Sequence, residues 1–86
     1  MARLTILYFA WVRERIGRDE QQIAHPGTET TIMALLDALA TDSPGHAAAF
    51  ADRSRLRAAL DQRFVPLDTA IGESRELALF PPVTGG

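Results

Sequence analysis

The sequence lacks cysteine, and this absence excludes several kinds of chemistry. A chain without a thiol forms no disulfide, no thiolate metal site and no cysteine nucleophile. Its two histidines, His25 and His46, are far apart and have no paired acids beside them, a pattern that predicts surface residues rather than metal ligands. Ser-His-Asp, P-loop and dinucleotide-binding motifs are also missing. We therefore expect no bound metal or cofactor, and no catalytic machinery in this chain alone.

The chain also lacks an excess of positive charge and a long apolar run. Its formal net charge is −2, and arginines and acidic residues are mixed along its length. No basic stripe is present, so we expect no nucleic-acid partner. No apolar stretch approaches the roughly 20 residues that cross a bilayer, and residues 1–4 do not begin a signal peptide. These features predict a cytoplasmic protein without a membrane partner.

What the chain does contain suits one small folded domain. It has 86 residues, of which 47% are hydrophobic, too many for a disordered chain. A domain of this size buries only roughly 60–65% of the surface that its unfolded chain exposes. We therefore expect a thin core, which a partner covering apolar surface would stabilise.

Apolar patterning predicts five strands and two helical segments. Residues 3–10 read as a central strand covered on both faces, because both sets of alternating side chains are largely apolar. Residues 13–19 read as a polar connection, and residues 20–24 as a second strand. A short strand at 56–60 turns at Asp61 and Gln62 into an edge strand at 63–65, which ends before a proline. The last strand is expected at residues 75–80.

The main helix is predicted after residue 31. Thr30 or Thr31 can accept hydrogen bonds from its first free amides. Apolar residues then recur at the spacing of one helix face, at Ile32, Leu35, Leu36 and Leu39. An alanine-rich stretch at residues 46–52 predicts a second, short helical piece.

This order of elements predicts the α+β class and the β-grasp arrangement of ubiquitin. We expect a mixed sheet of four to five strands, with the main helix packed on one face. The first and last strands should pair in parallel in the middle of the sheet. Residues 1–80 would form the domain, and residues 81–86 an extended tail.

The tail carries the most informative motif. Pro81 and Pro82 fix φ and remove backbone donors, so the last strand should end at Phe80. Six residues could then project roughly 20 Å. Gly85 and Gly86 have no side chain, so they could enter a slot too narrow for a Cβ. A Gly-Gly ending alone is a weak signal, since many chains end in glycines.

With this setting, residues 80–86 resemble the ending Phe-Pro-Pro-Val-x-Gly-Gly of the small subunit of molybdopterin synthase. Residues 8–14, Tyr-Phe-Ala-Trp-Val-Arg-Glu, resemble the first strand and loop of the same family. The chain length, the helix position and the hairpin at 56–65 also fit. The resemblance covers essentially the whole chain and implies a ubiquitin-like β-grasp sulfur carrier.

The resemblance implies a reaction cycle in molybdenum cofactor biosynthesis. An ATP-dependent activating enzyme adenylates the carboxylate of Gly86, and sulfur from a persulfide donor converts it to a thiocarboxylate. Bound to the large subunit in a heterotetramer, the thiocarboxylate donates sulfur to cyclic pyranopterin monophosphate. The chain would hold no cofactor, and ATP would be used by the activating enzyme. If the chain carries sulfur, the absence of cysteine places that sulfur at the chain end.

The resemblance also implies which residues bind the partners. Phe9, Phe64 and Phe80 match apolar docking positions, and Arg13 matches a charged contact beside them. Each phenylalanine could instead be a core residue, and Arg13 a solvated one. The tail residues implied to enter the partner are Pro81, Pro82, Val83, Thr84 and Gly85. Thr84 would either position the tail by hydrogen bonding or serve as a spacer.

Two departures from the family concern turns. The family usually enters its last strand through Asp-Gly-Asp-Glu, whereas residues 73–76 here read Glu-Ser-Arg-Glu. We expect an altered turn, with Gly72 supplying the flexibility. The hairpin turn carries Asp61 where the family often has asparagine.

Other functions remain open. All nine basic residues are arginine, which reflects either codon bias or protection of an activated acyl group from lysine amines. A carrier for thiamine thiazole synthesis shares the fold and the Gly-Gly ending, but it lacks Phe-Pro-Pro. A ubiquitin-like protein modifier would join Gly86 to a lysine of another protein. A binding module with an incidental tail is the remaining alternative.

Overall fold

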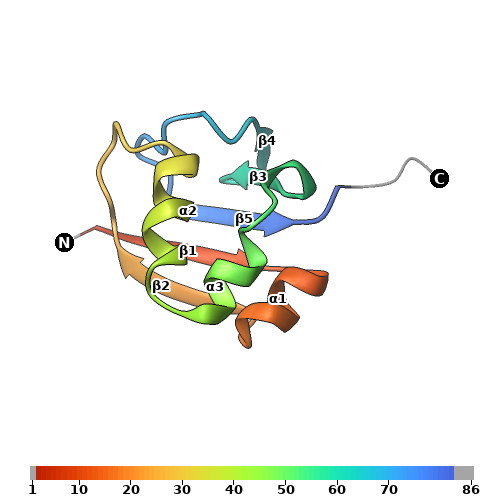
Figure 1. Cartoon of the computed structure of the whole chain (residues 1–86). Coiled ribbons are helices and arrows are strands. Elements are labelled where there is room, and N and C mark those ends of the chain that lie inside the picture. The colour runs from red at the N-terminus through yellow and green to blue at the C-terminus, as the bar shows by residue number, and fades with distance from the viewer. Residues whose placement is uncertain (1, 83–86) are drawn as a thin grey trace.

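The structure, a computed structural model, describes residues 2–82 and contains one five-stranded sheet (Figure 1). The strands lie in the order β2-β1-β5-β3-β4. β1 and β5 pair in parallel, and the other pairs are antiparallel. The strands are β1 (Arg3–Tyr8), β2 (Glu20–Ala24), β3 (Arg57–Leu60), β4 (Arg63–Val65) and β5 (Glu76–Phe80). The predicted α+β class, mixed sheet and parallel pairing of the first and last strands are confirmed.

The main helix, α2 (Ile32–Ala40), begins where the sequence predicts it. Thr31 is the N-cap, and its hydroxyl accepts a hydrogen bond from the amide of Ala34 at 3.1 Å. The helix packs one apolar face on the sheet because its four buried residues share that face. They are Ile32, Leu35, Leu36 and Leu39. In Figure 1, α2 and α3 lie in front of the sheet.

The second helical piece starts earlier than predicted. It is α3 (Pro44–Ala49), where residues 46–52 were expected. Ser43 caps it by accepting from the amide of His46 at 3.1 Å, and a proline suits the first helical position because its missing donor is not needed there. A short 3₁₀ turn, η1 (Arg53–Arg55), follows and was not predicted.

One prediction was wrong: the connection after β1 is a helix, α1 (Ala10–Ile16). It packs against α3 at the end of the sheet where β1 and β5 finish (Figure 1). Gly17 ends it with φ 91°, and the Gly17 amide donates to the carbonyl of Arg13 at 2.8 Å. Residues 13–16 of the predicted polar connection therefore form the second half of this helix, and residues 17–19 join it to β2.

The core lies between the sheet and the helices, so only one face of β1 is deeply buried. Leu4, Ile6 and Tyr8 are at most 1% exposed. The alternate residue Leu7 is half-buried, and Phe9 is 47% exposed. The expectation that both faces of this strand are covered was therefore wrong within residues 2–82. The helices cover one face of the sheet, and the other is open.

The two turns that depart from the family pattern are connected. Asp61 and Gln62 form the β3–β4 turn with φ of 47° and 71°. The Asp61 carboxylate accepts from the amides of Arg75 and Glu76, at 3.0 and 3.1 Å, and so holds the start of β5. Gly72 adopts φ 62°, a left-handed conformation that suits a glycine. The altered sequence before β5 is thus anchored from the neighbouring hairpin.

Candidate functional site

The open face of the sheet carries an apolar row. The register places Leu7 opposite Ala78, Ala78 opposite Ala59, and Ala59 opposite Phe64. Phe80 lies two residues beyond Ala78 and therefore points to the same side. We call these five residues the open face; Phe64 is exposed, Leu7, Ala78 and Phe80 are half-buried, and Ala59 is buried. They alternate along their strands with core residues such as Ile6, Leu77 and Leu79, which face the helices.

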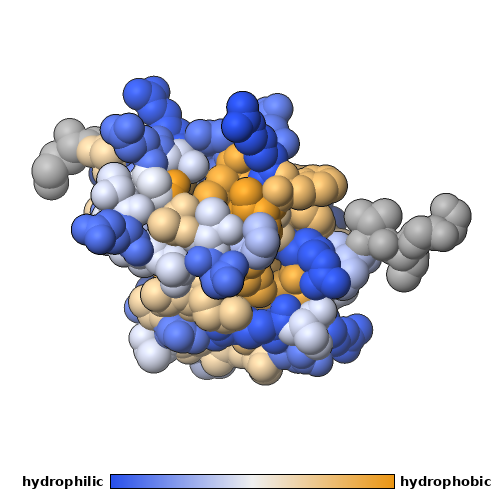
Figure 2. All heavy atoms as spheres, turned by 90° about the horizontal axis from the view of Figure 1, so that it is seen from above, coloured by the Kyte–Doolittle hydropathy of each residue, from blue (hydrophilic) through white to orange (hydrophobic). Residues whose placement is uncertain are grey.

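Two phenylalanines stack on this face. The ring centroids of Phe64 and Phe80 are 5.4 Å apart and their planes meet at 44°. Phe64 is nevertheless 79% exposed, an unusual position for a large apolar side chain. The two rings border a hollow of about 410 Å³, lined also by Arg57, Ala58, Val65 and Pro66. Phe64 and Phe80 thus form an apolar surface beside this hollow. Figure 2, which views the molecule from above the orientation of Figure 1, also shows apolar atoms between hydrophilic side chains. Such a surface is typical of a protein-binding site.

Phe9 and Arg13 lie at the end of β5. The Phe9 amide donates to the carbonyl of Leu79 at 3.2 Å, so Phe9 is adjacent to the end of the last strand. Arg13 follows one turn later on α1, and its amide donates to the carbonyl of Phe9 at 3.4 Å. Phe9 is 47% exposed and Arg13 is exposed. The alternative that Phe9 and Phe64 are core residues therefore does not hold.

The last strand points the chain away from the domain at this same end. β5 ends at Phe80, and Pro81 and Pro82 follow as half-buried residues without regular structure. The remaining predicted tail residues, Val83, Thr84, Gly85 and Gly86, lie outside the described residues. The structure thus brings Phe9, Arg13 and Phe80 to the end of the sheet from which the tail departs.

Two arginines lie over the Trp11 ring, a contact that was not predicted from the sequence. The guanidinium carbons of Arg15 and Arg55 lie 5.1 and 5.6 Å from the centre of the Trp11 ring. Arg57 donates to the carbonyls of Leu56 and Ser54, at 2.8 and 3.2 Å. The signal that could have been used is the spacing of Trp11 and Arg15, which face each other only if the segment is helical.

His46 is not a surface residue, contrary to the prediction. It is 7% exposed and lies in a polar cluster between α3 and the sheet. In the neutral tautomer that fits, its Nε2–H donates to Gln21 Oε1 at 3.0 Å and its Nδ1 accepts from the Ser43 hydroxyl at 2.6 Å. The Tyr8 hydroxyl also donates to Gln21 Oε1, at 2.7 Å. Burial lowers the pKa of His46 and raises that of Tyr8.

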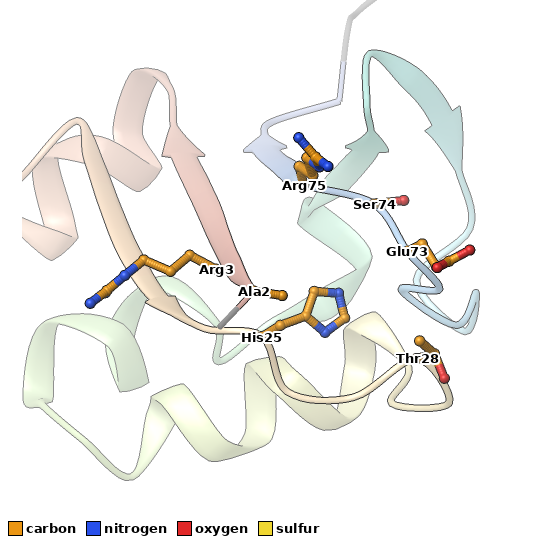
Figure 3. A pocket seen from close by; sticks show the side chains of 7 residues that line it. All are labelled: Ala2, Arg3, His25, Thr28, Glu73, Ser74 and Arg75. Carbon is orange, nitrogen blue, oxygen red and sulfur yellow. The ribbon is translucent and has the colours of Figure 1, made fainter.

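A second hollow, of about 550 Å³, lies at the opposite end of the sheet (Figure 3). His25 borders it. Its Nδ1 accepts from the amide of Gly27 at 3.1 Å, and its buried Nε2 has no partner within residues 2–82. Figure 3 shows the side chains of Arg3 and Arg75 pointing away from the His25 ring. Because its charged groups do not converge, this hollow is not the candidate site.

The fold and its open apolar face define a ubiquitin-like β-grasp protein. The chain belongs to the ThiS family, whose model matches residues 6–86. Within the described part of the chain, no helix combines the length and apolarity needed to span a membrane.

Individual relatives agree with the resemblance seen in the sequence. The molybdopterin synthase sulfur carrier subunit of Escherichia coli is 39% identical over 83 residues, which cover 96% of this chain and 99% of that protein. The protein of the same name from Haemophilus influenzae is 37% identical over the same shares. Among solved structures, the small archaeal modifier protein 1 of Haloferax volcanii is 26% identical with a TM-score of 0.74, covering 96% of this chain and all of that one.

Proposed function

We propose that this chain is the sulfur carrier subunit of a molybdopterin synthase and that Gly86 bears the reactive group. The observation that supports this most strongly is the family match, which extends to residue 86. Two relatives named molybdopterin synthase sulfur carrier subunit support it as well. The chain would act as the sulfur-donating subunit of a sulfurtransferase and would not be catalytic by itself.

The proposed chemistry starts from an unreactive group. A C-terminal carboxyl has a pKa of about 3.5, so at neutral pH it is an anion that nucleophiles do not attack. An activating enzyme would use ATP to form the acyl adenylate of Gly86 and release pyrophosphate. The terminal sulfur of a donor persulfide would displace AMP and form an acyl disulfide at Gly86. A second thiol, on the donor or in solution, would then attack the donor's sulfur, form a disulfide with it and release the thiocarboxylate. This group is a soft nucleophile, and it fits a chain that has no cysteine.

The proposed acceptor is cyclic pyranopterin monophosphate, held by the large subunit. Gly85 would give the tail access to a narrow slot, and residues 81–84 would span the distance from the domain. The exposure of Phe9 and Phe64 supports docking of the open face on the large subunit. Arg13 lies beside Phe9 and would add a charged contact. The expected complex is a heterotetramer in the cytoplasm.

Accurate-mass spectrometry tests the carrier role. The chain would be incubated with the activating enzyme of its host, ATP and a sulfur donor, and then fragmented. Fragmentation must localise the change, because oxidation of Met1 or Met33 adds nearly the mass gained when sulfur replaces oxygen. We expect a thiocarboxylate at Gly86. An unmodified terminus would contradict the proposal.

A protein modifier is the second candidate, because a small archaeal modifier protein shares the fold at a TM-score of 0.74. In that case Gly86 would be found in an isopeptide with a lysine of another protein. Transfer of sulfur to the thiamine thiazole, the other alternative, would show the same thiocarboxylate. Co-purification with a large synthase subunit separates that alternative from the proposed function.

A further inference from the structure

Four arginines form a collar at the end of the sheet from which the tail departs. They are Arg13, Arg15, Arg55 and Arg57, and all four are exposed. Two of them lie on α1, which packs beside the end of β5. Arg55 and Arg57 lie at the entry to β3, where Arg57 pairs with Phe80. Figure 1 shows that β5 finishes at the same end as α1.

The collar is not neutralised by the domain. Within residues 2–82, the ion pair between Arg53 and Asp37, at 2.8 Å, is the one contact of that kind closer than 4.0 Å. The carboxylates nearest the collar in sequence are Glu14 and Asp52, two against four arginines. Asp52 accepts from the amide and the hydroxyl of Ser54, which lowers its pKa, and the charge of Arg55 lowers that pKa further. Asp52 therefore offsets part of the charge of one collar arginine. The chain is therefore acidic as a whole but basic at its tail end.

The collar is also partly ordered before any partner binds. Arg15 and Arg55 lie over the Trp11 ring, which is half-buried between α1 and the core. A guanidinium that stacks through its plane keeps the N–H groups along its edge free to pair with carboxylates. Ordering these long side chains in advance reduces the entropy that binding would otherwise cost.

From this arrangement we infer that the collar docks against acidic residues of the large subunit, around the mouth of the site that receives the tail. This inference rests on the proposed function, since it takes the tail to be inserted into a partner protein. Opposite charges around the mouth would orient the chain with its tail end leading and speed its association. The collar would continue the apolar surface of Phe9, Phe64 and Phe80 with a charged rim, as in many interfaces.

A protein fits the collar better than a nucleic acid does. The hollow beside Arg57 is lined mostly by apolar groups, including Phe64 and Phe80. A nucleic acid would need a basic stripe long enough to follow its phosphate backbone, whereas this chain has a net charge of −2 and its collar holds four arginines. Carboxylates pair with the free guanidinium edges in a bidentate geometry.

Association kinetics with the large subunit of molybdopterin synthase from the same genome test the inference. The double variant R15E/R55E reverses two collar charges. Its matched control, R3E/R75E, changes the net charge equally at the opposite end of the sheet, where both arginines are exposed. Stopped-flow fluorescence or biolayer interferometry would give the association rate constant at low and high ionic strength, and circular dichroism would check folding. A second variant, R15Q/R55Q, removes the two charges without reversing them. It replaces R15E/R55E in the experiment if that variant does not fold.

At low salt, we expect R15E/R55E to associate about tenfold more slowly than the wild type, and the control to change by less than about threefold. The difference in association rate between R15E/R55E and the wild type should shrink at about 0.5 M salt, because charges more than a few ångströms apart are then screened from each other. Equal slowing of both variants, or no change in either, would overturn the inference that the collar docks on the large subunit, and would leave the proposed function intact. A wild-type chain that does not bind the large subunit at all would overturn both.

Discussion

At the scale of single residues, two phenylalanines occupy opposite environments. Phe50 is 1% exposed and its ring centroid lies 5.9 Å from that of His46. Phe64 is 79% exposed and stacks on Phe80 at the open face. Truncating a buried phenylalanine removes apolar burial and leaves a cavity, whereas truncating an exposed one removes little that folding has gained. Truncation to alanine should therefore affect mainly stability at Phe50 and mainly partner binding at Phe64.

We expect Phe64→Ala to change the free energy of unfolding by less than about 1 kcal/mol. It should weaken binding to the large subunit by at least about tenfold, because exposed aromatic anchors dominate binding energy once a partner covers them. The control, Phe50→Ala, should cost about 3–5 kcal/mol of stability. Urea melts and titration calorimetry measure the two quantities. Undiminished binding by the Phe64 variant would remove the open face from the docking surface.

His46 predicts a pH dependence of stability. Burial lowers its pKa in the folded chain; Asp42 opposes this shift and Arg18 adds to it. The unfolded chain therefore binds a proton more readily, so stability rises with pH across this window. The contribution is fully present above the ordinary pKa of about 6.5 and is lost as pH falls below it. Protonation at Nδ1 would also remove the hydrogen bond that it accepts from Ser43.

We expect the melting temperature of the wild type to fall by a few degrees between pH 7.5 and pH 5.5. His46→Gln keeps polar groups at this position but does not titrate in that range. At pH 7.5 the melting temperature of this variant should be lower than that of the wild type. Between pH 7.5 and pH 5.5 it should change less than that of the wild type. Differential scanning calorimetry gives both curves. Parallel curves for the two proteins would show that the cluster does not sense pH.

At the scale of elements, α2 could be predicted from the sequence and α1 could not. α2 has four apolar residues on one face and a threonine cap. α1 buries only Val12, has no side-chain cap, and begins at Ala10 with φ 54°, where glycine would be the usual signal. A helix of seven residues is marginal by itself and depends on tertiary packing, here against α3. Such packing leaves no periodic pattern to detect.

The close contact between α1 and α3 can be tested by whether Gly45→Ala raises or lowers the free energy of unfolding. A Cβ added at Gly45 would lie 2.7 Å from the carbonyl oxygen of Arg15, which is backbone and cannot easily give way. Helix propensity alone would make Gly45→Ala stabilising by up to about 1 kcal/mol. The clash should instead destabilise the domain by about 1–3 kcal/mol. Ala47→Gly, at an exposed position of α3, measures the propensity effect alone.

Chemical denaturation of the Gly45 variant gives the sign. A lower midpoint at unchanged slope would support the close approach of the two helices. A higher midpoint would mean that α1 and α3 can move apart at little cost.

At the scale of the whole molecule, the sequence predicted the topology but not which surface is open. The parallel pairing of β1 and β5 follows from two hairpins around one helix, and it brings residues near both ends of the chain together. Alternation along β1 places apolar residues on both faces, so it cannot tell whether helices or a partner cover Leu7 and Phe9. Only the placement of α2 and α3 on one side decides this. The tail motif could be recognised because it is local, whereas the collar joins segments about 40 residues apart.

The separation of domain and tail gives the last prediction. The core cluster lies between Leu4 and Leu79, so deletion of Gly86 should change the free energy of unfolding by less than about 0.5 kcal/mol. The shortened chain still ends in a carboxylate, on Gly85, but about 3.5 Å further back. Because a misplacement of 1 Å can cost about 100-fold in rate, we expect thiocarboxylate formation and sulfur transfer to fall by at least that factor. Thermal melts measure the stability, and intact-mass spectrometry measures the sulfur loading. Undiminished loading would show that the position of the terminal carboxylate does not matter. Strong destabilisation would show that the tail belongs to the folded domain.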